Sequence, residues 1–395
     1  MKRAFAAVLL LVSLVAAFLL AALPMLDHAA DPRWVAAEAH GGRLAVVAGL
    51  ALLELSGPPE LRGRQAAALV GDQGRDLLAV MRWSPQEAVA DKARRAAVLG
   101  ATRASDRAEL DAFAAATGCD PAALLRANST IETMCTAVAH LPSATVARNM
   151  DFFPADALGP ATIVQVVREP GRRTYAAVGW PAMAGVISGM NDAGLSACIL
   201  LNWNGEDPPP GEPLAFRVRA ILQDCADVDA GIAAMRAAPV GSPHYVLLMD
   251  VRSTAVAWWA PNGLHVDRAG ADGWLVASNA VRDGCVPCRD DDRGGSLVTA
   301  CAALTATPDP AWFRRATSAS YMVGLNAQAM VLSSRDRRLE LAVATGMTPA
   351  ALNSWHTVEL GPLLDGATVD RALVRQLPAE TPMRHYSSGA SPPRP

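Results

Sequence analysis

The chain has 395 residues, of which 51% are hydrophobic, and its formal net charge is −3 at pH 7. This length suggests two or three domains at roughly 150 residues each, although one large domain with an N-terminal appendage is also allowed. The chain has no basic cluster to neutralise phosphates, which argues against nucleic-acid binding. Lysine occurs only at Lys2 and Lys92, which disfavours Schiff-base and Ser–Lys chemistry.

The N-terminal stretch MKRAFAAVLLLVSLVAAFLLAALPML begins with two cations and then carries no charge over residues 4–26. This run exceeds the core of a typical signal peptide, about 7–15 residues, and approaches the roughly 20 residues of a membrane-spanning helix. We therefore predict that residues 1–30 form a signal peptide or an N-terminal membrane anchor that contacts the membrane. Because the positive end stays inside, the rest is expected outside the cytoplasm, in the periplasm or secreted.

Residues 31–134 are predicted to form a mostly helical segment. The stretches DKARRAAVLG, DRAELDAFAAATG and DPAALLRANS are rich in alanine, begin at aspartate, and two of them stop at glycine, as helices commonly do.

The pattern changes at residue 135, and residues 135–377 are predicted to form a second domain. Short runs rich in β-forming residues occupy 162–203 and 244–279, two helices are expected over 214–241, a further helix near 296–306, and a hairpin over 329–344. Strands and helices in separate blocks favour an α+β fold with layered sheets and outer helices. Residues 378–395 are rich in proline, serine and arginine and are predicted to be a disordered tail.

Seven cysteines occur in the chain. An odd number in an exported protein leaves at least one thiol outside a disulfide. Cys285 and Cys288 form a Cys-x-x-Cys pair, for which a local disulfide is favoured over a metal site because no second ligand pair follows at suitable spacing. No metal and no organic cofactor is expected.

Cys135 is followed thirteen residues later by Arg148, and then by Asp151. If the Met134–Cys135 bond were cut, Cys135 would carry both a thiol and a free α-amine. The ordinary pKa values of these groups, about 8.5 and about 7.7–8.0, suit proton transfer between them near neutral pH. A nearby guanidinium favours a thiolate, and a carboxylate could orient the ammonium. A small buried apolar residue is the alternative for a cysteine alone.

The stretches MCTAVAH and ARNMDF resemble the N-terminal nucleophile (Ntn) hydrolases of the linear-amide C–N hydrolase family, which includes penicillin acyltransferase, acid ceramidase and choloylglycine hydrolase. The resemblance rests on Cys135, Thr136, Arg148, Asn149 and Asp151. It extends to the glycine-rich stretch over 180–202, to GWLVASNAVRD, to DDDRGG, and upstream to LELSGPPELRGRQ.

The resemblance implies roles for individual residues. Asn279 would hold the oxyanion, and Arg293 would complete a catalytic set with Cys135, Arg148 and Asp151. Asn149, Met190 and Asn191 would contact the substrate, although Asn191 also fits an ordinary tight turn.

The implied fold is a four-layer αββα sandwich. The implied activity is that of a self-cleaving cysteine amidohydrolase or acyltransferase. It would cut itself at Met134–Cys135 and retain residues up to Met134 as a bound small chain. It would then cleave the linear amide of a small N-acylated substrate through an acyl-thioester. Two alternatives stay open: a non-catalytic relative that binds acyl ligands, and a Cys–His hydrolase that is never cut.

Overall fold

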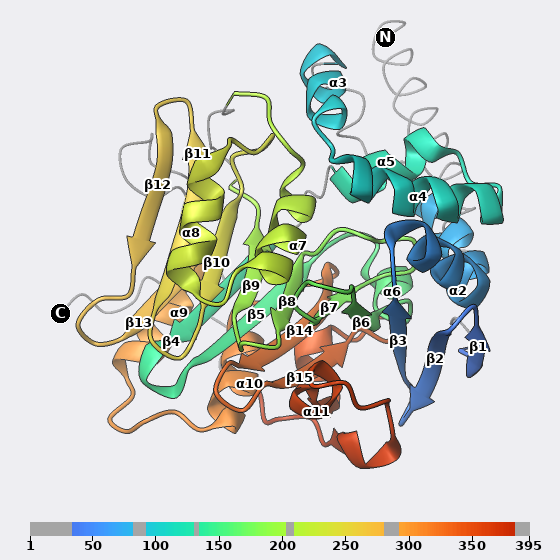
Figure 1. Ribbon diagram of the computed structural model, residues 1–395. Helices are drawn as coiled ribbons and strands as arrows, with labels where there is room; N and C mark the ends of the chain where they lie inside the picture. The colour runs from blue at the N-terminus through green and yellow to red at the C-terminus, as the bar shows by residue number, and fades with distance from the viewer. Residues whose placement is uncertain (1–33, 82–91, 130–133, 203–208, 280–291, 384–395) are drawn as a thin grey trace, which may run out of the picture.

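The computed structural model describes residues 34–81, 92–129, 134–202, 209–279 and 292–383. Two β-sheets lie face to face, and helices cover their outer faces (Figure 1). The α+β class predicted from the sequence is therefore confirmed.

The larger sheet crosses the whole molecule and has ten strands. All neighbours are antiparallel except β3 and β6, which run parallel. In spatial order the strands are β1 (Ala37–Ala39), β2 (Gly42–Val47), β3 (Leu50–Ser56), β6 (Ile163–Arg168), β7 (Tyr175–Gly179), β8 (Ser188–Asn191), β9 (Ser196–Leu200), β10 (Tyr245–Met249), β11 (Thr254–Ala260) and β12 (Gly263–Arg268). The strands predicted over 162–203 and 244–268 are all present.

The smaller sheet has seven antiparallel strands and contains Cys135, Arg148 and Asp151. The hairpin predicted over 329–344 is confirmed, whereas the last two strands of the chain were not foreseen. In spatial order the strands are β13 (Trp274–Ala277), β4 (Met134–His140), β5 (Thr145–Asp151), β14 (Asn326–Ser333), β15 (Arg338–Val343), β16 (Trp355–Glu359) and β17 (Val374–Leu377).

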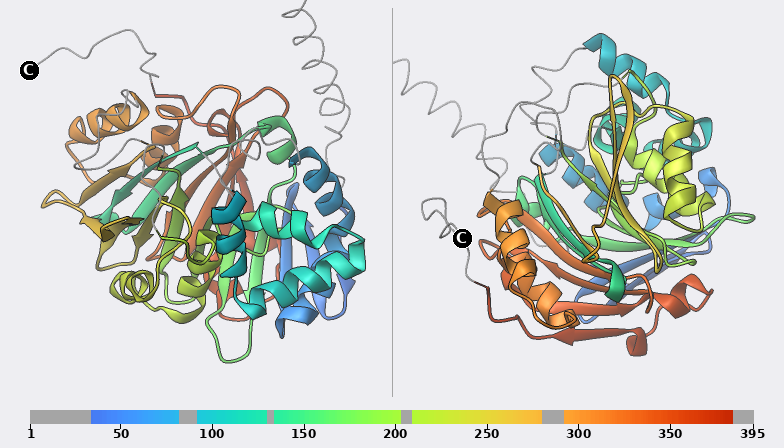
Figure 2. Two further views of the ribbon diagram at one scale, coloured as in Figure 1. Left: turned by 90° about the horizontal axis from the view of Figure 1, so that it is seen from above. Right: turned by 90° about the vertical axis from the view of Figure 1, so that its left-hand side faces the viewer.

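Helices form the two outer layers. The larger sheet is covered by α7 (Leu214–Asp224) and α8 (Val228–Ala237), and Asp227 caps α8. The smaller sheet is covered by α9 (Asp292–Ala302) and α10 (Pro310–Ser318), of which α10 was not predicted. The short helices α6 (Ala155–Leu158) and α11 (Leu360–Leu364) lie against β14, β15 and β7. Figure 2 shows the four layers edge-on in its right-hand view.

The main hydrophobic core lies between the two sheets. It combines residues of the small sheet, such as Met150 and Met330, with residues of the large sheet, such as Val164 and Ile199, all 2% exposed or less. A second cluster under α10 includes Phe313 and Trp355. The αββα sandwich implied by the resemblance is thus present.

The described part of the segment over 31–134 is mostly helical, as predicted, but its beginning is not. Helices α2 (Pro59–Met81), α3 (Lys92–Gly100), α4 (Ala104–Thr117) and α5 (Pro121–Ser129) form as expected, but residues 37–56 form strands β1 to β3. Two-residue turns at His40-Gly41 and Ala48-Gly49 connect these strands, and all four residues have positive φ, as type I′ hairpin turns require. An Ala-Gly turn is an unusual signal for a hairpin, and the surrounding alanine and leucine favoured a helix.

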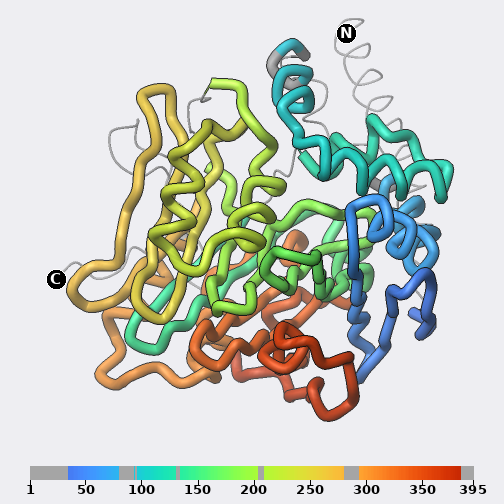
Figure 3. The backbone as a smooth tube through the Cα atoms, in the orientation of Figure 1, coloured from blue at the N-terminus to red at the C-terminus, as the bar shows by residue number. Residues whose placement is uncertain are grey.

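This segment is continuous with the rest of the fold (Figure 3). Strand β3 pairs with β6 inside the large sheet, and α2 covers that end of the sheet. The N-terminal segment is therefore part of the same body and not a separate domain.

A buried ion cluster joins the two parts of the chain. Glu109 on α4 accepts hydrogen bonds from Arg62 on α2 at 2.7 Å and from Arg219 on α7 at 2.5 Å. Burial acts to raise the pKa of Glu109, but the two guanidinium groups outweigh it and hold that pKa below its ordinary value. This cluster, called the Glu109 clamp below, ties residues before Met134 to residues after it.

The predictions for the two ends of the chain can be compared with the structure only where it describes residues. Residues 378–383 are ordered against the body, where Glu380 pairs with Arg314 at 2.5 Å, so the predicted disordered tail over 378–395 is wrong for that part. Residues 384–395, the segment 1–30 and the Cys285–Cys288 pair lie outside the described residues. Within the described ranges, no helix is both long and apolar enough to cross a membrane.

We expect Glu109→Gln to lower the free energy of unfolding by about 1–3 kcal/mol. The change removes the carboxylate that two buried guanidinium groups share, and leaves Arg62 with Glu169 and Arg219 with Asp106. Urea unfolding followed by circular dichroism measures this. The control is Asp111→Asn, a similar loss of one carboxylate at an exposed position of the same helix. Equal stability of both variants and the parent chain would show that the Glu109 clamp contributes nothing.

Candidate active site

The site is built on the antiparallel pair β4 and β5. Cys135 pairs with Met150, and Ala137 pairs with Arg148. Because side chains alternate along a strand, Cys135, Arg148 and Met150 face the core between the sheets. The intervening residues, including Asn149 and Asp151, face the helical layer of α9 and α10.

The sulfur of Cys135 lies 2.7 Å from Nη2 of Arg148, which donates to it. Both side chains are buried, at 0% and 1% exposure. The other guanidinium nitrogen, Nη1, donates across the core to the Ser188 hydroxyl and to the Ile187 carbonyl at 3.3 Å. Arg148 therefore bridges the two sheets beside the thiol.

Arg148 forms no ion pair with a carboxylate among the described residues. A buried guanidinium without a carboxylate partner retains its full attraction for a nearby anion. The contact thus places a positive charge directly beside the Cys135 sulfur, the atom that acts as nucleophile in reactive cysteines.

Asn279, just after β13, contacts the backbone of the same cysteine. Its Oδ1 accepts from the Cys135 amide nitrogen at 2.9 Å and from Arg293 Nη2 at 2.7 Å, and its Nδ2 donates to the Leu201 carbonyl at 2.6 Å. Two donors on one side and a carbonyl on the other fix which way this amide points.

Asp151 is the last residue in a series of hydrogen bonds that begins at the Cys135 amide nitrogen. Its Oδ2 accepts from Arg293 Nη1 at 2.9 Å, and its Oδ1 accepts from the Met322 amide at 3.2 Å and from Asn326 Nδ2 at 2.9 Å. Burial raises the pKa of Asp151 to about 6, and the positive charge of Arg293 and the two hydrogen bonds limit that rise. Asp151, Arg293, Asn279 and the amide nitrogen of Cys135 are thus linked in series.

The five residues predicted as catalytic all meet at this point. The predicted cleavage site also lies here, since Met134 is the first residue of β4 and pairs with Asp151.

The residues predicted to contact substrate are placed differently. Asn149 faces α10, donating to the Thr317 carbonyl at 2.8 Å. Asn191 bonds to the carbonyls of Leu222 and Cys225 in the helical layer, and its Oδ1 caps the turn before β9. Met190 is fully buried in the main core. The side chains of Asn149 and Asn191 therefore lie away from the core face that holds the Cys135 sulfur.

Two polar residues of the site were not singled out from the sequence. Ser188 contacts Arg148, and Asn202 follows Leu201 at the end of β9, 4% exposed, with its Oδ1 unpartnered among the described residues. Both lie in the glycine-rich stretch that the resemblance includes. Their position opposite Cys135 depends on how the two sheets stack, which no local pattern encodes.

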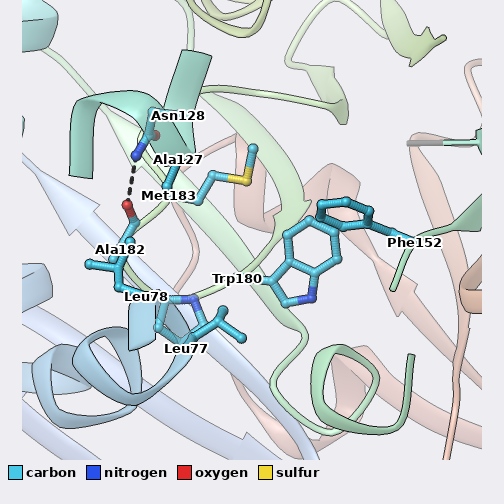
Figure 4. Close-up of a pocket in the computed structure, with 9 residues that line it drawn as sticks. Leu77, Leu78, Ala127, Asn128, Phe152, Trp180, Ala182 and Met183 are labelled. Carbon is cyan, nitrogen blue, oxygen red and sulfur yellow. Dashed lines mark hydrogen bonds between the residues drawn. The ribbon is translucent and has the colours of Figure 1, made fainter. Parts of the chain in front are cut away.

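An apolar pocket is lined in part by Phe152, the residue after β5 (Figure 4). Phe152 and Trp180 form one side, with ring centroids 5.9 Å apart. The enclosed space that a water-sized sphere can enter is about 20 Å³, and the hollow with its open mouth measures about 340 Å³. It is lined by Leu77, Leu78, Ala127, Asn128, Phe152, Trp180, Pro181, Ala182 and Met183. Four of these residues precede Met134, so both parts of the chain form its wall.

Phe152 connects the pocket to Cys135. It follows Met150 by two residues, about 7 Å along an extended chain, and Met150 is the cross-strand neighbour of Cys135. Phe152 packs against the same core cluster that contains Cys135. Over the described ranges, no group of three or more His, Cys, Asp or Glu side chains is arranged to hold a metal ion.

Comparison with known proteins adds a family match. The family model described as acyl-coenzyme A:6-aminopenicillanic acid acyl-transferase matches residues 141–281. That region contains Arg148, Asp151 and Asn279 and ends before Arg293. A search of the curated proteins gave no match.

Similar solved structures share little sequence with this chain. A Caenorhabditis elegans ortholog of N-acylethanolamine-hydrolyzing acid amidase is 18% identical, with a TM-score of 0.41 over 51% of this chain and 93% of that one. Penicillin V acylase from Agrobacterium tumefaciens is 12% identical, with a TM-score of 0.39 over 62% and 98%. A mutant of conjugated bile acid hydrolase from Clostridium perfringens is 11% identical, with a TM-score of 0.43 over 64% and 100%.

These similarities are low, and the fold assignment rests on the four layers described above. The family match agrees with the motifs noted in the sequence. Residues 141–281 thus match the penicillin acyltransferase family, and the resemblance of the chain to the linear-amide Ntn hydrolases is confirmed.

Proposed function

We propose that the protein is a cysteine amidohydrolase or acyltransferase that matures by cutting its own Met134–Cys135 bond. The observation that carries this proposal is the position of the Cys135 amide nitrogen. It is hydrogen-bonded to Asn279, and through Asn279 to Arg293 and Asp151. A cysteine that acts through its sulfur alone would not require a series of polar side chains hydrogen-bonded to its backbone nitrogen.

Maturation would begin with attack of the Cys135 sulfur on the Met134 carbonyl carbon. The C–N bond breaks, the nitrogen of Cys135 takes up a proton and becomes a free amine, and a thioester forms. Water then cleaves the thioester, releasing the Met134 carboxylate and restoring the thiol. The Glu109 clamp would hold the resulting small chain, residues up to Met134, against the large chain.

In turnover, the new α-amine takes the proton of the thiol as the sulfur attacks a linear amide, and later gives it to the leaving amine. An acyl-thioester on Cys135 results, and water or an acceptor amine resolves it. Asn279 is the proposed amide donor to the oxyanion. Its Oδ1 faces the Cys135 nitrogen and one Nδ2 hydrogen bonds to the Leu201 carbonyl, so the other Nδ2 hydrogen is the one that would donate. Asn202, whose buried side chain follows Leu201, is a second candidate donor.

A histidine base is the main rival. His140 lies at the far end of β4, bonded to Ser143, and His265 stacks on Trp258. His244 precedes β10, whose first residue pairs with Leu200, and so lies toward the Asn279 end of the sheet. It is therefore the histidine to test.

Intact mass is expected to show two chains in the parent protein, one ending at Met134 and one starting at Cys135. Cys135→Ala removes the attacking sulfur and should give one uncut chain without amidase activity. His244→Ala should be cut and should keep activity within about tenfold of the parent, because the α-amine is the base.

Other outcomes identify the rivals. An uncut parent chain that cleaves amides, and loses that activity in His244→Ala, would establish the Cys–His hydrolase. An uncut and inert parent chain would favour the non-catalytic acyl-binding relative.

The rate of self-cleavage should fall about tenfold from about pH 7 to about pH 5, because protonation of Asp151, whose pKa is about 6, removes the negative charge that holds Arg293. Asp151→Asn should be slow at every pH and lose this dependence. If Asp151→Asn showed the same fall in rate at low pH as the parent protein, the titrating group would be a residue other than Asp151.

The raised pKa of Asp151 also determines how its contribution to folding stability changes with pH. The folded-state pKa of Asp151 lies above its ordinary value of 3.8, so the folded chain binds this proton more tightly. The contribution of Asp151 therefore favours folding below about pH 4 and is lost as the pH rises through about 6.

The apolar pocket suggests the substrate. Its lining by aromatic and aliphatic side chains next to Phe152 suits the acyl group of an N-acyl amide better than a charged group. We accordingly propose a small N-acyl amide with an apolar acyl chain, handled outside the cytoplasm.

Ala127→Leu, on α5, should narrow this pocket and lower kcat/KM for long acyl amides about tenfold relative to the acetyl amide, because overpacking excludes the longer chain. Ala122→Leu adds the same side chain at an exposed position of the same helix and should change neither value. Kinetics on a series of acyl chain lengths measure this. An equal loss on every chain length would argue against acyl binding there.

A further inference from the structure

Ser188 reaches Arg148 from the opposite sheet. It begins β8, is fully buried, and its hydroxyl accepts a hydrogen bond from Arg148 Nη1. The same nitrogen also bonds to the Ile187 carbonyl at 3.3 Å, while Nη2 faces the Cys135 sulfur at 2.7 Å. One end of the guanidinium is thus anchored in the large sheet, and the other end is directed at the nucleophile.

The chemistry of this anchor differs from that of other buried arginines in the chain. Arg62 and Arg219, equally buried at 1% exposure, share the Glu109 carboxylate. Each also pairs with a second carboxylate, Glu169 for Arg62 and Asp106 for Arg219. Arg148 is held by a hydroxyl, a carbonyl and the Met150 thioether. Neutral acceptors fix the guanidinium in place without neutralising it.

The surrounding titratable groups do not take over that role. Cys198 is the cross-strand neighbour of Ser188, and burial raises the pKa of its thiol to about 11, so it stays neutral near pH 7. Asp151 projects from the opposite face of β5 and pairs with Arg293, which also donates a hydrogen bond to Asn279. The charge of Arg148 therefore remains directed at Cys135.

We propose that Ser188 is a positioning residue that holds Arg148 against Cys135 while leaving its positive charge available to the thiolate. The inference rests on the proposed function, since it assumes that Cys135 is the nucleophile. Serine meets both needs: it is small enough for the fully buried space between the sheets and carries no charge.

Two substitutions separate position from charge. Ser188→Ala removes the anchor, and Ser188→Asp replaces it with an anion that neutralises Arg148. Ser196→Ala is the control, because Ser196 is a buried serine on the adjacent strand whose hydroxyl bonds to Ser334 at 3.1 Å and not to Arg148. Circular dichroism verifies that each variant folds, and Ser188→Ala decides the question if Ser188→Asp does not.

The first readout is the ultraviolet absorbance of the Cys135 thiolate as a function of pH, taken as the difference from Cys135→Ala. In Ser188→Asp the midpoint should move up by about one pH unit or more. In Ser188→Ala it should move the same way by less, and Ser196→Ala should match the parent protein. Unchanged midpoints in both Ser188 variants would overturn the proposal.

The second readout is turnover, where Ser188→Ala should lower kcat about tenfold with KM within about twofold, because Ser188 touches the catalytic arginine and not the substrate. A change in KM alone would assign Ser188 to substrate binding instead. The absorbance titration also works on an uncut, inactive chain. If the protein never matures, the proposed function fails, while the titration still decides whether Ser188 controls the charge on Cys135.

Discussion

The structure depends on one buried contact, between the guanidinium of Arg148 and the sulfur of Cys135. A buried positive charge without a carboxylate partner is costly, and within the described ranges Arg148 carries such a charge where the two sheets meet. The small sheet supplies both residues on adjacent strands, and the large sheet supplies the neutral anchors at Ile187 and Ser188. Sandwich packing and reactivity are therefore consequences of the same arrangement.

A second set of contacts acts on the other end of the cysteine. The sulfur faces the core, whereas the amide nitrogen joins Asn279, Arg293 and Asp151 on the side of the helical layer. Both environments meet within one residue, Cys135, one at its side chain and one at its backbone. The sulfur thus faces a positive charge, while the nitrogen is already bonded to the residues that would orient it as an amine.

The residues before Met134 are built into the same core. They supply three strands of the large sheet, part of the Glu109 clamp, and four of the nine residues that line the apolar pocket. If the chain is cut, β3 still pairs with β6 and the clamp still joins both parts. Loss of the small chain would open the core, so the active form is expected to contain both pieces.

Much of the site was predictable because Cys135, Arg148 and Asp151 lie on one hairpin, whose spacing is local. The contact with Ser188 was not, since it depends on which faces of two sheets meet. Strands β1 to β3 were missed because alanine and leucine favour helices, and tertiary pairing with β6 overrode that preference. Asn149 and Asn191 were expected on the substrate side for a different reason. A one-residue step along a strand reverses the face on which a side chain lies, and the sequence alone did not set that register.

The central claim is that Cys135 carries a thiol and a free α-amine together in the working protein. Cyanobenzothiazole reagents condense with that 1,2-aminothiol, and peptide mapping locates the product. The account predicts one equivalent of adduct, on the peptide that begins at Cys135, with activity lost in proportion. Fully active protein that forms no adduct at Cys135 would contradict it.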